Sequence, residues 1–212
     1  MKKTLLVSGC SVTHGAELHN GFMSPENVKL SFSQHLANKL DCNLLNVALS
    51  AASNEYIFHS LVKEILNNNN LHSVLVVWTS PDRLYWKRDD RHYFFLGNFA
   101  TSMVDLENFK MHDIRKNGCW FTSDNDQTLE TISTAHQFFV TEYFDQIRDL
   151  EKLQHYKFAL DEICNLRNIP LISLTFADLN TNNWYGKRHP TKDEHKQIAD
   201  LIYKNFYENI HL

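Results

Sequence analysis

The sequence contains a serine and a histidine whose positions suit acyl-transfer chemistry. Ser11 follows a short apolar run at residues 4–8, and His189 stands just before the last helical pattern of the chain. A serine hydroxyl becomes nucleophilic when an imidazole takes its proton, and nearby backbone amides or hydroxyls can stabilise the oxyanion that forms. The two residues lie near opposite ends of the chain, so the elements between them must bring them together.

Those elements alternate between strand and helix patterns. Continuous apolar runs, which are typical of buried parallel strands, occur at residues 4–8, 43–47, 73–78 and 170–176. Helical patterns occupy residues 29–40, 53–66, a long stretch at about 131–167, and 192–207, the last with Thr191 as its N-cap. This alternation predicts an α/β fold, a three-layer α/β/α sandwich with a parallel central sheet.

Polar residues follow each predicted strand. They are Gly9-Cys10-Ser11 after the first, residues 48–54 after the second, residues 79–83 after the third, and residues 178–189 after the fourth. In open parallel sheets, ligands bind beyond the carboxyl ends of the strands. We therefore expect these four segments to meet at one edge of the sheet.

In these segments the chain resembles the SGNH (GDSL-type) hydrolases. Gly9-Cys10-Ser11 is similar to their Gly-Asp-Ser block, residues 46–51 to their Asn-x-Gly-x-x-Gly block, residues 79–82 to Gly-x-Asn-Asp, and residues 186–189 to Asp-x-x-His. The blocks occur in the family's order and span nearly the whole chain except residues 84–130. The resemblance implies a flavodoxin-like sandwich and a serine hydrolase that acts on esters.

The resemblance also assigns roles. It makes Ser11 the nucleophile, His189 the general base, and the backbone amides of Ser11 and Ala51 oxyanion donors. Pro81 stands where the family's Asn would donate a side-chain amide, and proline has no backbone N–H to offer instead. A hydroxyl of Thr79 or Ser80 is the expected substitute donor.

The histidine block departs from the family in its acid. Gly186 stands where the family's Asp would orient the histidine. Asp178 or Asn183, earlier in the same loop, is the expected replacement. The alternative is that Ser11 and His189 work as a pair with a backbone carbonyl as the orienting group.

Four further residues are candidates for substrate binding, and each has a structural alternative. His14 lies close enough to Ser11 in sequence to line a pocket or to face solvent. Asp82 and Arg83 could bind a polar substrate or make structural ion pairs. Asn54 could contact substrate, although a residue at a helix start is more often a cap.

Length and composition fit one domain covering residues 1–212. Hydrophobic residues make up 43% and charged residues 22%, as in soluble globular proteins, and the net charge of −4 gives no reason to expect nucleic acid as a partner. No run approaches the roughly 20 apolar residues of a membrane helix. Scattered His and Cys residues without ligand spacing predict no metal, and the chemistry needs no cofactor.

The segment at about 84–130 breaks the strand–helix rhythm. It is rich in aromatic residues but has no clear periodicity, which favours an inserted subdomain or lid near the C-terminal edge of the sheet. The alternative is that it packs as extra core or forms the contact of a homo-oligomer.

The stretch LVSGC at residues 6–10 allows a second interpretation, a lipobox with Cys10 lipidated. A signal sequence needs about 7–15 apolar residues, and here only residues 4–7 precede Ser8 and Gly9. A strand that delivers Ser11 is therefore the favoured interpretation. The four scattered cysteines fit buried thiols in a reducing compartment, so we expect a cytoplasmic protein.

Two functions follow as hypotheses. The first is hydrolysis of an ester, either an O-acyl group on a carbohydrate or a small acyl ester. The second, motivated by Pro81 and Gly186, is a binding or assembly protein that keeps the sandwich but has impaired chemistry. A carboxylate or amide against the outer nitrogen of His189 would favour the enzyme.

Overall fold

The fold is built on a parallel sheet of four strands, seen in a computed structural model. The model describes residues 2–19, 24–49, 52–81, 83–88, 91–96, 146–179 and 189–208. The strands are β1 (Thr4–Ser8), β2 (Asn43–Asn46), β3 (Leu71–Trp78) and β6 (Leu171–Thr175). They pair in the order β2-β1-β3-β6, and every pairing is parallel. All four strands lie where the apolar runs predicted them.

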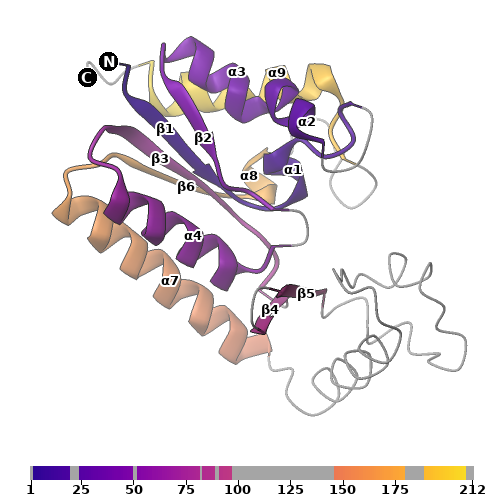
Figure 1. The fold of residues 1–212 in the computed structure, drawn as a ribbon, viewed down its shortest axis with the longest axis vertical. Coiled ribbons are helices and arrows are strands. Elements are labelled where there is room, and N and C mark those ends of the chain that lie inside the picture. Colours follow the sequence, from indigo (N-terminus) through magenta and orange to yellow (C-terminus); the bar gives the residue numbers. More distant parts are fainter. Residues whose placement is uncertain are drawn as a thin grey trace, which may run out of the picture.

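The sheet is buried because helices cover both of its faces (Figure 1). On one face lie α3 (Phe32–Lys39) and α9 (Lys192–Phe206), and on the other lie α4 (Asn54–Asn67) and α7 (Gln146–Leu166). In β3 the residues from Ser73 to Trp78 are buried without alternation, as expected for a strand covered on both sides. The predicted three-layer α/β/α sandwich is confirmed.

Side-chain caps fix the starts of α4 and α9. The Ser53 hydroxyl accepts a hydrogen bond from the Tyr56 amide at the start of α4. At α9, the Thr191 hydroxyl accepts from the Glu194 amide, and the Glu194 carboxylate accepts from the Thr191 amide, which completes a capping box. The prediction of Thr191 as N-cap is confirmed.

The helix predicted at 29–40 is instead two helices. A first, α2 (Pro25–Leu30), ends at Ser31, which has extended backbone angles (φ −73°, ψ 159°) and also caps the start of α3. The Ser31 hydroxyl donates to the Val28 carbonyl and accepts from the Gln34 amide. Serine forms such local backbone bonds readily, and here they interrupt the helical pattern.

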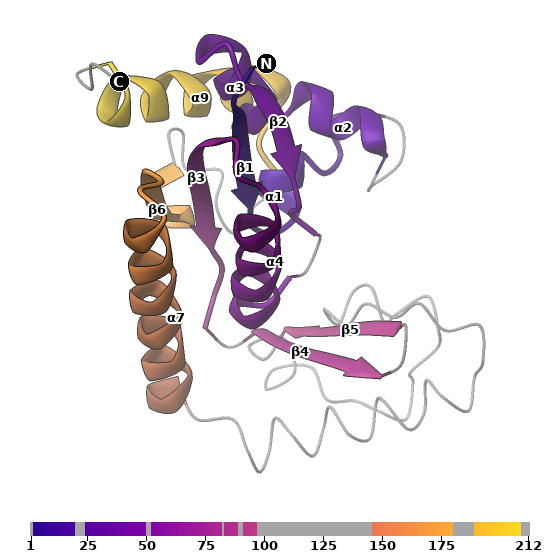
Figure 2. The ribbon, with the colours of Figure 1, turned by 60° about the vertical axis from the view of Figure 1, so that its left-hand side comes forward.

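Beyond β3 the chain forms an antiparallel hairpin of β4 (Arg83–Arg88) and β5 (Arg91–Leu96). Figure 2 shows it beyond the end of the sheet, next to the beginning of α4. The first part of the predicted 84–130 insertion is thus a hairpin, and residues 97–130 lie outside the described part of the chain. Two short helices, α1 (Ser11–His14) and α8 (Phe176–Leu179), follow β1 and β6. Among the described helices, none is long and apolar enough to cross a membrane.

Candidate active site

The nucleophile candidate stands on a tight turn between β1 and α1. Cys10, which is fully buried, is the N-cap residue, and Ser11 is the first residue of α1. A Cβ atom on Gly9 would lie 2.2 Å from the Thr13 hydroxyl and 3.1 Å from the Val77 carbonyl. Only glycine therefore lets α1 turn so closely over the end of β1, and this turn presents Ser11 at the carboxyl edge of the sheet.

The loop after β2 is bonded directly to this turn. The Leu49 amide donates to the Gly9 carbonyl at 3.2 Å. The Asn46 amide group donates to the Thr13 carbonyl at 3.0 Å, and its Oδ1 accepts from the Ala48 amide at 2.9 Å. Asn46 thus holds two loops together, a role that the sequence analysis did not assign. Ala51, the predicted oxyanion donor, lies outside the described residues.

The fold brings His189 to Ser11. The Nε2 atom of His189 lies 2.9 Å from the Ser11 hydroxyl, and 25% of the His189 side chain is exposed. His189 immediately precedes Pro190 and the capped start of α9, so the capping box anchors the chain next to the imidazole. This is the spacing expected of a nucleophile and its general base.

The outer nitrogen of His189 contacts Glu17, which the sequence analysis missed. The Nδ1 atom lies 2.9 Å from Glu17 Oε2. Asp178, the expected acid, is used elsewhere, because its Oδ2 accepts from the Thr175 amide and hydroxyl, both at 2.7 Å. The expectation for Asp178 is therefore corrected: its carboxylate bonds Thr175, just before α8, and the carboxylate at His189 is Glu17. Asn183 lies outside the described residues.

Thr79 carries one of the two hydroxyls expected to replace the missing Asn. The residue is 5% exposed, and its hydroxyl has no hydrogen-bond partner among the described residues. Ser80 is half-buried, and its carbonyl accepts from the Arg83 amide. A buried hydroxyl with no partner is costly unless it has a use, so Thr79 is the stronger oxyanion candidate of the two.

Asn54, a candidate for substrate binding, uses its whole amide group on the end of β3. Its Oδ1 accepts from the Thr79 amide at 2.9 Å, and its Nδ2 donates to the carbonyls of Thr79 at 3.1 Å and Ser80 at 3.3 Å. Asn54 is 5% exposed. The expectation that it binds substrate is corrected, because its donors and acceptor join α4 to β3.

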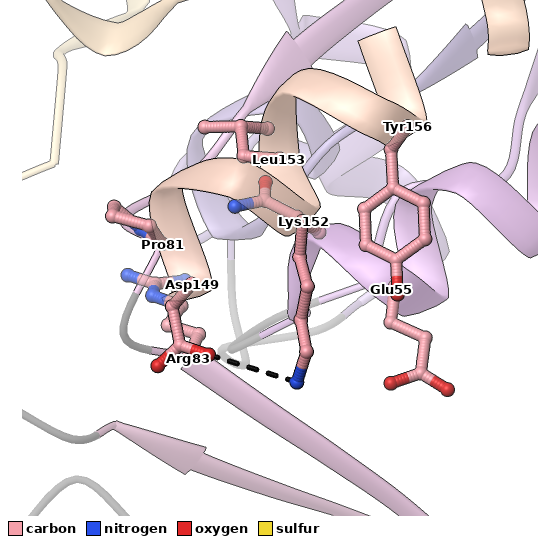
Figure 3. Close-up of a pocket in the computed structure, with 8 residues that line it drawn as sticks. Glu55, Pro81, Arg83, Asp149, Lys152, Leu153 and Tyr156 are labelled. Carbon is pink, nitrogen blue, oxygen red and sulfur yellow. Dashed lines mark ion pairs between the residues drawn. The ribbon is translucent and has the colours of Figure 1, made fainter. Parts of the chain in front are cut away.

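Arg83 lines a pocket at the edge of the hairpin (Figure 3). The residues that line it are Asn54, Glu55, Pro81, Arg83, Asp149, Lys152, Leu153 and Tyr156. Asp149 is 5% exposed and pairs with Lys152 at 3.7 Å, the dashed line in Figure 3. Neither Ser11 nor His189 is among the lining residues, so the structure does not bring Arg83 together with the serine. Asp82 lies outside the described residues.

Cys10, the N-cap residue of α1, and His14, the last residue of α1, are near Ser11 in the chain. The Cys10 sulfur lies 3.6 Å from the Ser11 hydroxyl, in the position where the resembling family has Asp. His14, a candidate for substrate binding, is half-buried, and burial lowers the pKa of its imidazole. At neutral pH His14 is therefore uncharged and adds no positive charge beside the nucleophile.

Within the described residues there is no group of three His, Cys, Asp or Glu side chains that could hold a metal ion. The site instead contains a chain of contacts, in which the Ser11 hydroxyl meets the His189 imidazole and the imidazole meets the Glu17 carboxylate. Such an arrangement is suited to nucleophilic attack with general-base assistance.

Comparison with known proteins finds similarity to solved structures only. No protein-family model and no curated protein matches the sequence. Similar solved structures include a psychrotrophic esterase from Pseudoalteromonas sp. (14% identity, TM-score 0.41, 95% of each chain covered). They also include a lipase/acylhydrolase from Enterococcus faecalis (17%, 0.38, 96% of this chain and 94% of that one). A third is a member of the lipolytic G-D-S-L family from Veillonella parvula (12%, 0.39, 97% and 98%). At these identities the function must be argued from the site itself.

Proposed function

We propose that this protein is an SGNH-like serine hydrolase that cleaves an ester through a Ser11–His189 acyl-enzyme mechanism. The observation that carries the proposal is the 2.9 Å contact between the Ser11 hydroxyl and Nε2 of His189. The carboxylate at the other ring nitrogen favours the enzyme over the binding-protein hypothesis. A binding protein that had lost the chemistry would not need an imidazole aligned between a carboxylate and a serine.

In this mechanism His189 first acts as a base. Its Nε2 takes the Ser11 proton as the serine oxygen bonds to the acyl carbon, which gives a tetrahedral oxyanion. The ester C–O bond then breaks, and the imidazolium gives its proton to the leaving alcohol. Water, deprotonated by His189, attacks the acyl-enzyme, and the carboxylic acid leaves as Ser11 regains its proton.

The oxyanion needs donors at the sheet edge. We assign this role to the backbone amides of Ser11 and Ala51 and to the buried Thr79 hydroxyl. The substrate class we propose is an O-acyl group on a carbohydrate or a small acyl ester. An ester is preferred because an alcohol leaves more easily than an amine.

A fluorophosphonate probe tests the nucleophile directly. The wild-type protein should be labelled at Ser11 and should hydrolyse short p-nitrophenyl esters. Ser11→Ala should abolish labelling, and His189→Ala should slow it by at least about 10²-fold, the usual size of a general-base contribution. Ser60→Ala, a change to a half-buried serine in α4, is the matched control and should keep labelling at Ser11. Folded wild-type protein with neither labelling nor turnover would refute the proposal.

A further inference from the structure

Glu17 and Ser11 lie on opposite nitrogens of the same imidazole. The two contacts, Glu17 Oε2 to Nδ1 and Ser11 Oγ to Nε2 of His189, are each 2.9 Å. We infer that Glu17 is the positioning residue of this site, supplied by the loop after the nucleophile instead of the loop before the histidine. The inference rests on the proposed function and explains why Gly186 can stand where the resembling family has its acid.

The contact with Glu17 determines where the imidazole carries its proton. A carboxylate only accepts hydrogen bonds, so Nδ1 of His189 must hold a proton to bond Glu17. In the neutral ring this leaves Nε2 without a proton and able to accept from the Ser11 hydroxyl. Glu17 therefore selects the tautomer in which His189 can act as a base.

The loop that carries Glu17 is fixed to the nucleophile itself. The Ser11 carbonyl accepts hydrogen bonds from the amides of Gly15, at 3.0 Å, and Ala16, at 2.9 Å. Ala16 is 1% exposed and Leu18 is 7% exposed, so buried residues anchor the chain on both sides of Glu17. The carboxylate and the serine thus belong to one packed unit, and His189 is held between them.

The backbone conformation of Glu17 indicates that its side chain has a use. Its φ is +68°, a left-handed conformation that glycine adopts at little cost and glutamate adopts with strain. Strained positions of this kind tend to be kept where a particular side chain has a use. The side chain is 57% exposed, so solvent screens its charge, and orientation of the imidazole is its main effect.

The first test is Glu17→Gln, which keeps the size of the side chain but removes the carboxylate. We expect kcat for a p-nitrophenyl ester to fall by about 10²- to 10⁴-fold with KM little changed, because the tautomer and orientation of the base are lost. The control is Glu26→Gln, which changes another partly exposed carboxylate that makes an ion pair, with Lys29, outside the site. This variant should keep wild-type kcat.

A second variant separates positioning from folding. Glu17→Gly relieves the positive φ, so its melting temperature should not fall, whereas its kcat should fall as in Glu17→Gln. In this background, Gly186→Asp places an acid three residues before His189 in the chain and should restore part of the lost kcat. Rescue at a different position would show that the carboxylate acts through the histidine.

A spectroscopic readout completes the test. The proton on Nδ1 of His189 should give a downfield NMR signal in the wild-type protein that is lost in Glu17→Gln. If Ser11 is labelled but Glu17→Gln keeps both kcat and this signal, the inference about Glu17 is overturned and the proposed function stands. If the wild-type protein is not labelled at all, the proposed function fails, and the role of Glu17 fails with it.

Discussion

At the scale of single residues, Thr79 gives a sharp test of the oxyanion site. Its hydroxyl is buried without a partner among the described residues. Thr79→Val keeps the shape and removes the hydroxyl, so kcat should fall by about 10²- to 10³-fold if the hydroxyl stabilises the oxyanion. Stability should rise slightly, because an unsatisfied buried group is removed. Steady-state kinetics and urea unfolding measure the two effects.

Thr13→Val is the matched control for that experiment. The Thr13 hydroxyl is also buried without a partner among the described residues, but it packs against Gly9. The control should therefore keep wild-type kcat. Equal kcat for wild type and Thr79→Val would remove Thr79 from the oxyanion site.

Sequence reasoning singled out Ser11 and His189, which the structure brings into contact, but it did not single out Glu17, which contacts the other ring nitrogen of His189. The serine and histidine were predictable because each follows a strand or precedes a helix in a recognisable block. Glu17 was not, because an acid in the loop after Ser11 has no periodicity or spacing that marks it. The one available signal was Gly186, whose missing carboxylate required a replacement somewhere at the sheet edge. Asp178 is the nearest acid before His189 in the chain, but its carboxylate binds Thr175.

At the scale of elements, Asn54 joins the start of α4 to the end of β3. Asn54→Ala would leave the buried Thr79 amide without its acceptor, and each such loss costs about 1–3 kcal/mol. We expect the free energy of unfolding to fall by at least this amount. Asn67→Ala, at the exposed end of the same helix, should leave it nearly unchanged. Urea unfolding of both variants provides the measurement.

The kinetics of Asn54→Ala distinguish its two interpretations. As a structural clamp, Asn54 affects kcat through the position of Thr79 and leaves KM close to that of the wild type. A large rise in KM with unchanged stability would instead restore Asn54 as a substrate ligand. The hydrogen bonds to Thr79 and Ser80 favour the first result.

Element boundaries show where periodicity is a sufficient guide. The strands and the start of α9 were predicted correctly. Strands buried on both faces appear in the sequence as continuous apolar runs, and the capping residue Thr191 marks where α9 begins. The break at Ser31 was missed, because the apolar spacing of residues 29–40 continues across it while the serine side chain ends one helix and starts the next. Side-chain capping thus overrode the hydrophobic period.

At the scale of the whole molecule, the layer formed by α3 and α9 contains a buried histidine. His195 is 0% exposed, and its Nδ1 accepts a hydrogen bond from the Phe32 amide at 2.9 Å. Burial, with smaller contributions from the charges of His35 and His189, lowers the pKa of His195 to about 3, and Glu194 opposes this shift. The neutral imidazole is therefore part of the contact between the two helices.

This burial predicts that acid weakens the fold. In the unfolded chain His195 binds a proton below about pH 6.5, whereas in the folded protein it stays neutral down to about pH 3. The unfolded state then holds more protons, so this contribution to stability is complete above pH 6.5 and is lost progressively as the pH falls toward 3. Between pH 7 and pH 5 the loss from this residue is about 2 kcal/mol.

His195→Gln tests this pH dependence, because glutamine can still accept the Phe32 hydrogen bond but does not titrate. The variant is expected to be less stable at pH 7, where a packed ring is lost. The comparison that matters is within each protein: from pH 7 to pH 5, the wild type should lose about 2 kcal/mol more than the variant in urea unfolding. The pKa values of His14, His35 and His72 are also lowered by burial, and these residues remain in both proteins. Equal losses in the two proteins would show that His195 becomes protonated without unfolding the α3–α9 layer.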